Sequence, residues 1–175
     1  MNTRYLAIAV LMLLAACASS SDRAKLTDPE VAMVVRVSNL GEVREGQLAR
    51  DKATDAAVRD FAQMMVIEHT AASNQAESDL ARADIPSADS SLSRQIDANS
   101  GSATDMLRAS PAGPAFDRAY MDRQVDAHRY VLGVIDQTLV PNARSKVLRR
   151  VLADMRKLIE QHLTRVQQIQ TTLAK

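Results

Sequence analysis

The chain has few of the residues that β-sheet proteins and disulfide-rich proteins depend on. Its 175 residues include no Trp, 3% aromatic residues, five Gly, five Pro and one Cys. Scarce aromatic and β-branched residues argue against a sandwich or a barrel. A single cysteine excludes an intramolecular disulfide. Since 46% hydrophobic residues are too many for a disordered chain, one all-α domain is the expected fold class.

The chain also lacks a surplus of charge and the common catalytic motifs. Its formal net charge is +1, whereas binding to nucleic acid requires a clear basic surplus. No Gly-x-Ser-x-Gly elbow, phosphate-binding Gly-rich loop or His-Glu-x-x-His zinc helix is present. We therefore predict no nucleic-acid partner, and the sequence gives no support to an enzymatic activity.

The beginning of the chain, up to Cys17, has the organisation of a secretory signal. Residues 1–4 are positively charged, and the apolar run 5–14 is too short to remain as a membrane span. Leu14-Ala15-Ala16-Cys17 resembles the lipobox of bacterial lipoproteins, in which the cysteine is acylated and becomes the new N-terminus. We predict a signal peptide over 1–16 and a covalent lipid on Cys17. The alternatives are an ordinary signal peptide that happens to contain a cysteine, or a buried cysteine in a hydrophobic helix.

Residues 17–27 are small and polar after the cysteine, as in a flexible tether. By resemblance to lipoproteins of Gram-negative bacteria, Ala18 directly after the cysteine points to the outer membrane. We therefore expect the chain on the periplasmic side of the outer membrane, with the membrane itself as one partner through the lipid. An envelope protein or a second copy of the chain are further possible partners.

The prolines divide the remainder into helical segments. All five lie outside three long proline-free stretches, which is typical of a helical protein. We predict helices over 28–52, 54–83, 114–140 and 142–175. Asp28, Thr54 and Asn142 are the expected N-caps, and the third helix is expected to end before Pro141.

The segment 84–115 is rich in Ser, Gly and Pro and is predicted to be a crossover. Two short helices are expected in it, around 92–96 and 104–108. An extended chain of this length can cross a bundle about 40 Å long at roughly 3.3 Å per residue. The pattern therefore predicts two helical hairpins joined by a long crossover, in a four-helix domain over 28–175.

The three histidines lie on the apolar seams of three different helices, where residues repeat at alternating steps of four and three. These are His69, His128 and His162. Glu42 lies on one of two candidate inner lines of the first helix, and Glu68 precedes His69. Inward imidazole and carboxylate groups from separate helices build the metal sites of helical bundles. A standard di-iron site needs Glu-x-x-His instead, since adjacent residues diverge by about 100°.

A rise of 1.5 Å per helical residue places Glu42, His69 and His128 within roughly 8 Å along the bundle axis. The same estimate leaves His162 about 8 to 15 Å away, as an uncertain ligand. The sequence thus predicts a three-ligand cluster, with His162 or Glu68 nearby. The alternative is that the histidines are neutral core groups hydrogen-bonded to carboxylates or carbonyls.

Three methionines share these seams, and a thioether with an imidazole would suit copper. Methionine at such spacing is otherwise ordinary core filling. The residues are Met65, Met121 and Met155.

Several short motifs, in their order and spacing, resemble the bacterial domain-of-unknown-function family 4142. They are the runs 41–49 and 58–70, the segment 116–120, His128 and His162. The resemblance spans about Asp28 to Ala174 and implies a ferritin-like four-helix fold in a secreted or outer-membrane-associated protein. It also implies polar positions at Glu42 and the three histidines, while Glu68 replaces the more usual Asp before the histidine.

Two functions from different classes remain open. The first is a lipid-anchored binding or envelope-interaction module that needs no cofactor and in which the histidines are structural. The second is a protein that binds iron, zinc or copper, in metal handling or oxidative stress. The sequence alone favours the first.

Overall fold

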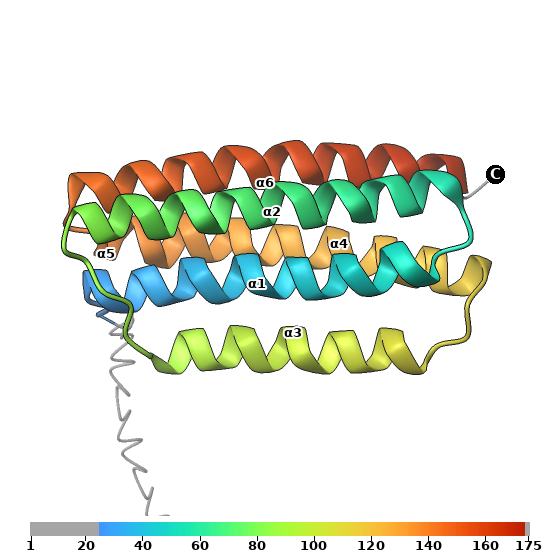
Figure 1. Ribbon diagram of the computed structural model, residues 1–175, viewed down its shortest axis with the longest axis horizontal. Coiled ribbons are helices and arrows are strands. Elements are labelled where there is room, and N and C mark those ends of the chain that lie inside the picture. Colours follow the sequence, from blue (N-terminus) through green and yellow to red (C-terminus); the bar gives the residue numbers. More distant parts are fainter. Residues whose placement is uncertain (1–24, 174–175) are drawn as a thin grey trace, which may run out of the picture.

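The computed structural model describes residues 25–173, and every regular element among them is helical (Figure 1). The elements are α1 Asp28–Lys52, α2 Ala56–Arg82, α3 Ser91–Ala109, α4 Pro114–Val134, the π-helical turn η1 Ile135–Leu139, α5 Val140–Asn142 and α6 Lys146–Leu173. The all-α prediction is confirmed. The predicted signal peptide 1–16 and Cys17 lie outside the described residues, as does most of the tether.

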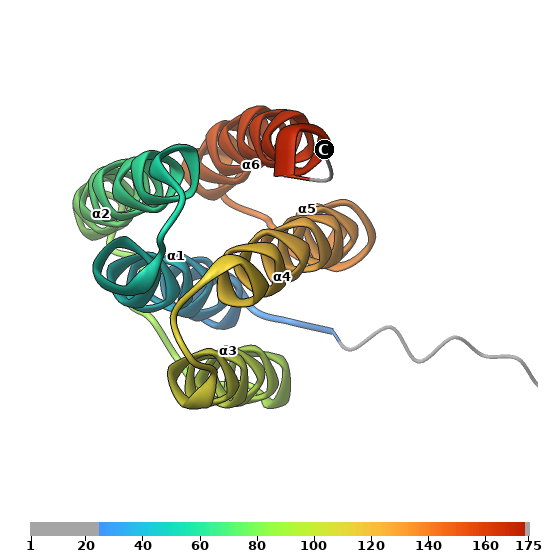
Figure 2. The ribbon, with the colours of Figure 1, turned by 90° about the vertical axis from the view of Figure 1, so that its right-hand side faces the viewer.

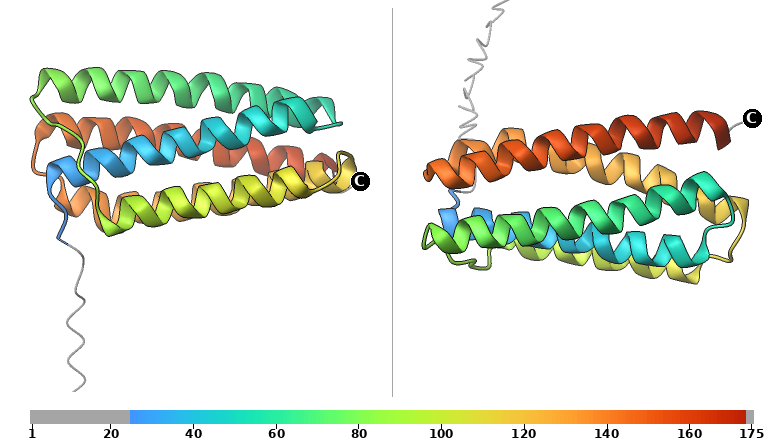
Figure 3. Two further views of the ribbon diagram at one scale, coloured as in Figure 1. Left: turned by 60° about the horizontal axis from the view of Figure 1, so that its bottom comes forward. Right: turned by 45° about the horizontal axis from the view of Figure 1, so that its top comes forward.

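Helices α1, α2, α6 and α4 lie around a common interior, and α3 lies outside them against α1 and α4 (Figures 2 and 3). The α1–α2 turn and the α5–α6 turn are at opposite ends of the molecule (Figure 1). None of the described helices is both long enough and apolar enough to cross a membrane.

The crossover differs from the prediction of two short helices. It contains one helix of 19 residues, α3, so the described chain has a fifth long helix. Ser90 and Ser93 form its N-terminal capping box, in which the Ser93 N–H donates to Ser90 Oγ at 3.0 Å. Ile96, Ala103 and Leu107 form a buried stripe at helical spacing. This stripe keeps α3 helical despite its Ser and Gly content.

Gly41 allows α3 to lie close to α1. A Cβ atom at this position would stand 2.6 Å from Ser100 Oγ, which is closer than real Cβ contacts. Glycine in a helix interior lowers the stability of the isolated helix. Here Gly41 of α1 lets α3 approach closely, because it has no Cβ atom.

The N-cap of α1 is Thr27, and the prediction of Asp28 was wrong. Glu30 Oε2 accepts hydrogen bonds from the Thr27 N–H and Oγ1, both at 2.8 Å. The Asp28 carboxylate instead reaches the other hairpin, where it accepts from the N–H groups of Arg144 at 2.7 Å and Ser145 at 2.9 Å. Asp28 therefore ties the start of α1 to the turn before α6.

The opposite end of the molecule repeats this arrangement. The N-cap of α2 is Asp55, not the predicted Thr54. Asp117 of α4, which is 1% exposed, accepts from the Thr54 N–H at 3.0 Å, the Thr54 hydroxyl at 2.6 Å and the Asp55 N–H at 2.8 Å. Each hairpin thus supplies an aspartate that holds the turn of the other.

The helical path continues past Pro141, so the predictions of a helix end before it and of a cap at Asn142 were wrong. The Val140 N–H donates to the Ile135 carbonyl, as in a π-turn. This wider turn accommodates a proline, which has no N–H to donate and would clash with a carbonyl in a regular α-helix. Asn142 ends α5, and α6 begins at Lys146.

The core consists of two apolar clusters with polar residues between them. The first contains Val31 and Val35 of α1, and the second contains Ala49 and Ala53. The other three helices of the interior also pass from one cluster to the other. The polar residues between the clusters are Ser38, Asn39, Glu42, Glu45, His69, Gln124, His128 and His162, all buried. We call them the polar layer.

Asp117→Ala tests the tie between the hairpins. The substitution leaves the Thr54 and Asp55 N–H groups without their acceptor, so we expect a loss of about 2 kcal/mol in the free energy of unfolding. Urea denaturation measures it. The control, Asp105→Ala, removes an exposed ion pair with Arg108 and should change stability by less than about 0.5 kcal/mol. Equal effects of the two substitutions would contradict this role of Asp117.

Candidate metal centre

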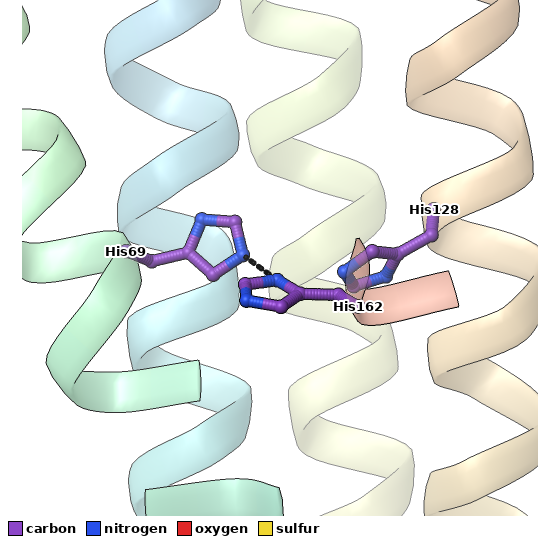
Figure 4. A group of neighbouring side chains, drawn as sticks. All are labelled: His69, His128 and His162. Carbon is purple, nitrogen blue, oxygen red and sulfur yellow. Dashed lines mark hydrogen bonds between the residues drawn. The ribbon is translucent and has the colours of Figure 1, made fainter. Parts of the chain in front are cut away.

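The three histidines meet in the polar layer, one from each of α2, α4 and α6 (Figure 4). His69, His128 and His162 are each 1% exposed. One ring nitrogen of each lies within 4.8 Å of those of the other two. Among residues 25–173, no other set of His, Cys, Asp and Glu side chains brings ligand atoms together in this way.

Hydrogen bonds determine which ring nitrogen of His69 carries its proton. His69 Nδ1 lies 2.8 Å from Asn39 Oδ1. The Asn39 amide is oriented because its Nδ2 donates to the Val35 carbonyl at 2.9 Å. Since Asn39 Oδ1 can only accept, the Nδ1 of His69 is the donor. His69 Nε2 then has a free lone pair.

The other two rings are oriented in the same manner. His162 Nε2 donates to Glu68 Oε2 at 2.8 Å, and His128 Nδ1 donates to the Gln124 carbonyl at 2.8 Å. A neutral imidazole has one N–H only. Therefore His162 Nδ1 and His128 Nε2 also have free lone pairs.

Two of these lone pairs face each other. His69 Nε2 and His162 Nδ1 are 3.2 Å apart, along the dashed line in Figure 4. Neither carries a proton when both rings are neutral, so the pair lacks a donor. His128 Nε2 is buried and has no hydrogen-bond partner among the described residues. A cation shared by the three nitrogens would satisfy all of them.

Burial keeps the rings neutral. Desolvation lowers the pKa of His69 well below its usual value, lowers that of His128 to about 4, and lowers that of His162. Neutral imidazole is the form that binds transition metals. Two nitrogens at the usual zinc distance in a tetrahedral site are about 3.3 Å apart, close to the separation of His69 and His162.

The prediction that His162 lies apart from the cluster along the bundle axis was wrong. It placed the start of the last helix at Asn142, whereas α6 begins at Lys146. This later start moves His162 by about 6 Å along the axis. The turn between α5 and α6 is now the common reference point. His128 and His162 lie at nearly the same helical distance from it, one before the turn and one after it. The two rings are therefore level.

Glu42 lies beside the histidines rather than among them. It lines a small cavity of about 10 Å³ together with Ser38, His69, His128, Val131, Met155 and Ile159. Its Oε2 is buried and has no hydrogen-bond partner among the described residues. Burial raises its pKa to about 7, although the Arg123 charge and Gln124 lower it in part.

A second buried carboxylate, Glu45, lies one turn further along α1. Arg123 binds it through two hydrogen bonds, Nε to Oε2 at 3.1 Å and Nη2 to Oε1 at 2.8 Å. Burial raises the pKa of Glu45 to about 7, and the neighbouring Glu42 raises it further against the effect of Arg123. The α1 side of the polar layer is therefore rich in carboxylate.

Glu68 lies outside the cluster. Its side chain is 42% exposed and reaches only the outer nitrogen of His162. This position suits a residue that orients a ligand rather than one that binds the ion. Of the three methionines, Met155 lines the small cavity, whereas Met65 and Met121 belong to the second apolar cluster.

Sequence reasoning did not find Asn39 or Gln124 as partners of the histidines. The feature of the sequence that could have indicated them is that both are uncharged polar residues on helix faces that are otherwise apolar. Both are at most 1% exposed. A backbone carbonyl partner, as at Gln124, leaves no signal in the sequence.

Glu42→Gln tests the burial of this carboxyl. The folded state keeps the Glu42 proton up to about pH 7, whereas an unfolded chain releases it near 4.5. Its contribution to stability is therefore full below pH 4.5 and is lost as pH rises through 7. In EDTA at pH 8 we expect the variant to be about 3 kcal/mol more stable than wild type.

At pH 4.5 the Glu42→Gln variant and the wild type should have similar stability, as measured by urea denaturation at both pH values. Glu77→Gln on the surface of α2 is the control and should show no gain at pH 8. A gain that is equal at both pH values would count against a buried, protonated Glu42.

Residues 14–169 match the family described as Domain of unknown function (DUF4142). No curated protein and no solved structure matches. Because the match covers most of the 175 residues, the chain belongs to the DUF4142 family.

Proposed function

We propose that this protein binds one divalent transition-metal ion through His69, His128 and His162. The observation that carries the proposal is the set of three unprotonated ring nitrogens that face one another inside the polar layer. Each opposite ring nitrogen is held by an oxygen atom, of Asn39, Gln124 or Glu68. Such oxygen partners orient metal-binding histidines and raise their basicity.

A purely structural role fits this arrangement less well. Buried polar groups in proteins are paired, and a neutral core histidine uses its second nitrogen to accept a hydrogen bond. None of the three lone pairs has a donor when the rings are neutral. An ion in their midst would supply the missing partner for all three.

The donor set narrows the choice of ion. Imidazole nitrogen suits zinc, copper, iron and nickel, and does not suit calcium or magnesium. Met155 in the adjoining cavity offers a thioether, which would favour copper. The function is therefore metal handling or metal-dependent protection in the cell envelope, with zinc, copper and iron as the ions to compare.

The proposal includes the fold family and the location. α1, α2, α4 and α6 form a ferritin-like four-helix bundle in which α3 is the crossover. The chain is lipid-anchored through Cys17 at the periplasmic side of the outer membrane. Support comes from the lipobox resemblance of residues 14–17 and the polar segment that follows.

The metal prediction is tested on the full-length chain in detergent, purified without a polyhistidine tag. We expect one Zn²⁺, Co²⁺ or Cu²⁺ per chain and a higher melting temperature with metal than with EDTA. An ion at a hundred times its Kd stabilises the folded state by about 2.7 kcal/mol. Calorimetric titration and thermal melting measure both quantities.

His128→Leu separates the metal role from a structural one. Because Leu has a similar volume and removes a buried unpaired nitrogen, the variant in EDTA should be within about 1 kcal/mol of wild-type stability. Its metal binding should be lost. Strong destabilisation in EDTA, with no metal bound by wild type, would favour the envelope-interaction module.

Glu68→Ala removes only the carboxylate that orients His162. We expect metal affinity to fall by about 10- to 100-fold. Glu77→Ala, at another exposed position of α2, is the matched control and should leave affinity unchanged. If Glu68→Ala behaves like the control, the carboxylate has no role in orienting His162.

The anchor is tested by Cys17→Ala in a Gram-negative host. We expect wild type to incorporate labelled fatty acid and to sediment with the outer membrane, and the variant to do neither. Release of the variant without loss of labelling would contradict attachment at Cys17.

A further inference from the structure

The structure has a second cavity beside the candidate metal centre, larger and open to the surface. It lies between α1, α3 and α4 and has a volume of about 220 Å³. Its outer part includes the exposed residues Asn99, Asp126 and Tyr130. Three residues line both this outer cavity and the small cavity at the histidines: Ser38, Glu42 and Val131.

The wall between the two cavities contains polar atoms without partners. Ser38 Oγ and Glu42 Oε2 are buried and have no hydrogen-bond partner among the described residues, as is also true of His128 Nε2. All three residues line the small cavity. Its volume of about 10 Å³ corresponds to about one water-sized group.

Three histidines leave a tetrahedral ion one ligand short. Structural zinc sites use four protein ligands, whereas sites that bind exchangeable molecules use three and leave one position open. Glu42 is not part of the group of ligand atoms within 4.8 Å of one another. A fourth ligand to such an ion would therefore come from a small molecule.

We propose that the ion proposed above has an open fourth position that takes water or a small monoanion, which enters through the outer cavity past Ser38 and Glu42 and accepts a hydrogen bond from Ser38. This inference rests on the proposed metal function. A divalent ion held by three neutral imidazoles keeps its full positive charge, which favours an anionic fourth ligand. Glu42 is the nearby carboxylate that opposes a bound anion, and Ser38 is the hydroxyl that can donate to it.

The experiment uses the full-length chain loaded with Co²⁺ and titrated with azide at pH 8. Azide binds through one terminal atom, and its ligation changes the visible spectrum of Co²⁺. For wild type we expect a saturable change. Removing the Glu42 charge in Glu42→Gln should lower the azide Kd by about tenfold.

Ser38→Val narrows the passage by one methyl group and removes the hydroxyl. We expect it to bind Co²⁺ as wild type does, to raise the azide Kd by about tenfold or more because the hydroxyl donor is lost, and to slow azide binding because the passage is narrower. Ser78→Val is the matched control on the exposed face of α2 and should bind azide like wild type. Glu42→Gln supplies an independent test if Ser38→Val fails to fold.

The outcomes separate the two proposals. No Co²⁺ binding by wild type would overturn the metal function itself. Co²⁺ binding with a spectrum that azide leaves unchanged would overturn the open position alone. A Co²⁺ spectrum altered by Glu42→Gln before azide is added would make Glu42 the fourth ligand and would also overturn it. An azide Kd for Ser38→Val equal to that of wild type would overturn the hydrogen bond from Ser38, and an equal rate of azide binding would overturn the assigned passage.

Discussion

The burial of a polar layer between two apolar clusters is the constraint on which the rest of this structure depends. Burying an imidazole or a carboxylate costs free energy unless its polar atoms are paired. The layer must therefore bring its members from different helices to one level, where they can pair. Asn39 pairs with His69 and Glu45 pairs with Arg123, and the Gln124 amide nitrogen also donates to Glu45. The histidine nitrogens that remain unpaired mark the place for an added partner.

The alignment of the four inner helices is held at their ends. Asp28 binds the turn before α6, and Asp117 binds the turn before α2. Each bond joins one hairpin to the other, so together they limit sliding of the hairpins along the axis. A shift of one residue would move a histidine by about 1.5 Å, which is enough to disturb a set of metal ligands. The ends of the molecule thus support the geometry at its centre.

The α3 helix gives the two sides of the layer different surroundings. Ser100 of α3 donates to Glu45 at 3.2 Å, and the close approach at Gly41 brings α3 over the carboxylates. The opposite side reaches the surface at Glu68, between α2 and α6. The imidazoles thus lie between Glu42 and the Arg123-bound Glu45 on one side and Glu68 on the other. The crossover therefore covers the polar layer in addition to joining the hairpins.

Much of the fold could be predicted from the sequence, because helical periodicity and proline placement are local properties. The predicted bounds of α1, 28–52, agree with the structure although its cap does not, and the inward placement of all three histidines followed from their seams. The helix N-caps could not be predicted in the same way. Asp28 and Asp117 accept hydrogen bonds from residues of the other hairpin, and no local sequence pattern reveals such contacts.

The sequence thus indicates which residues form the candidate site. Only the tertiary structure determines that their side chains come close to one another. The level of His162 depends on how the chain passes Pro141, where a π-turn carries the helix on to Asn142 before α6 begins at Lys146. The state of each ring depends on Asn39, on the Gln124 carbonyl and on Glu68, two of which come from a different helix than the histidine they hold. Sequence sets which face of a helix a side chain occupies, whereas the distance between two atoms on different helices is set by packing.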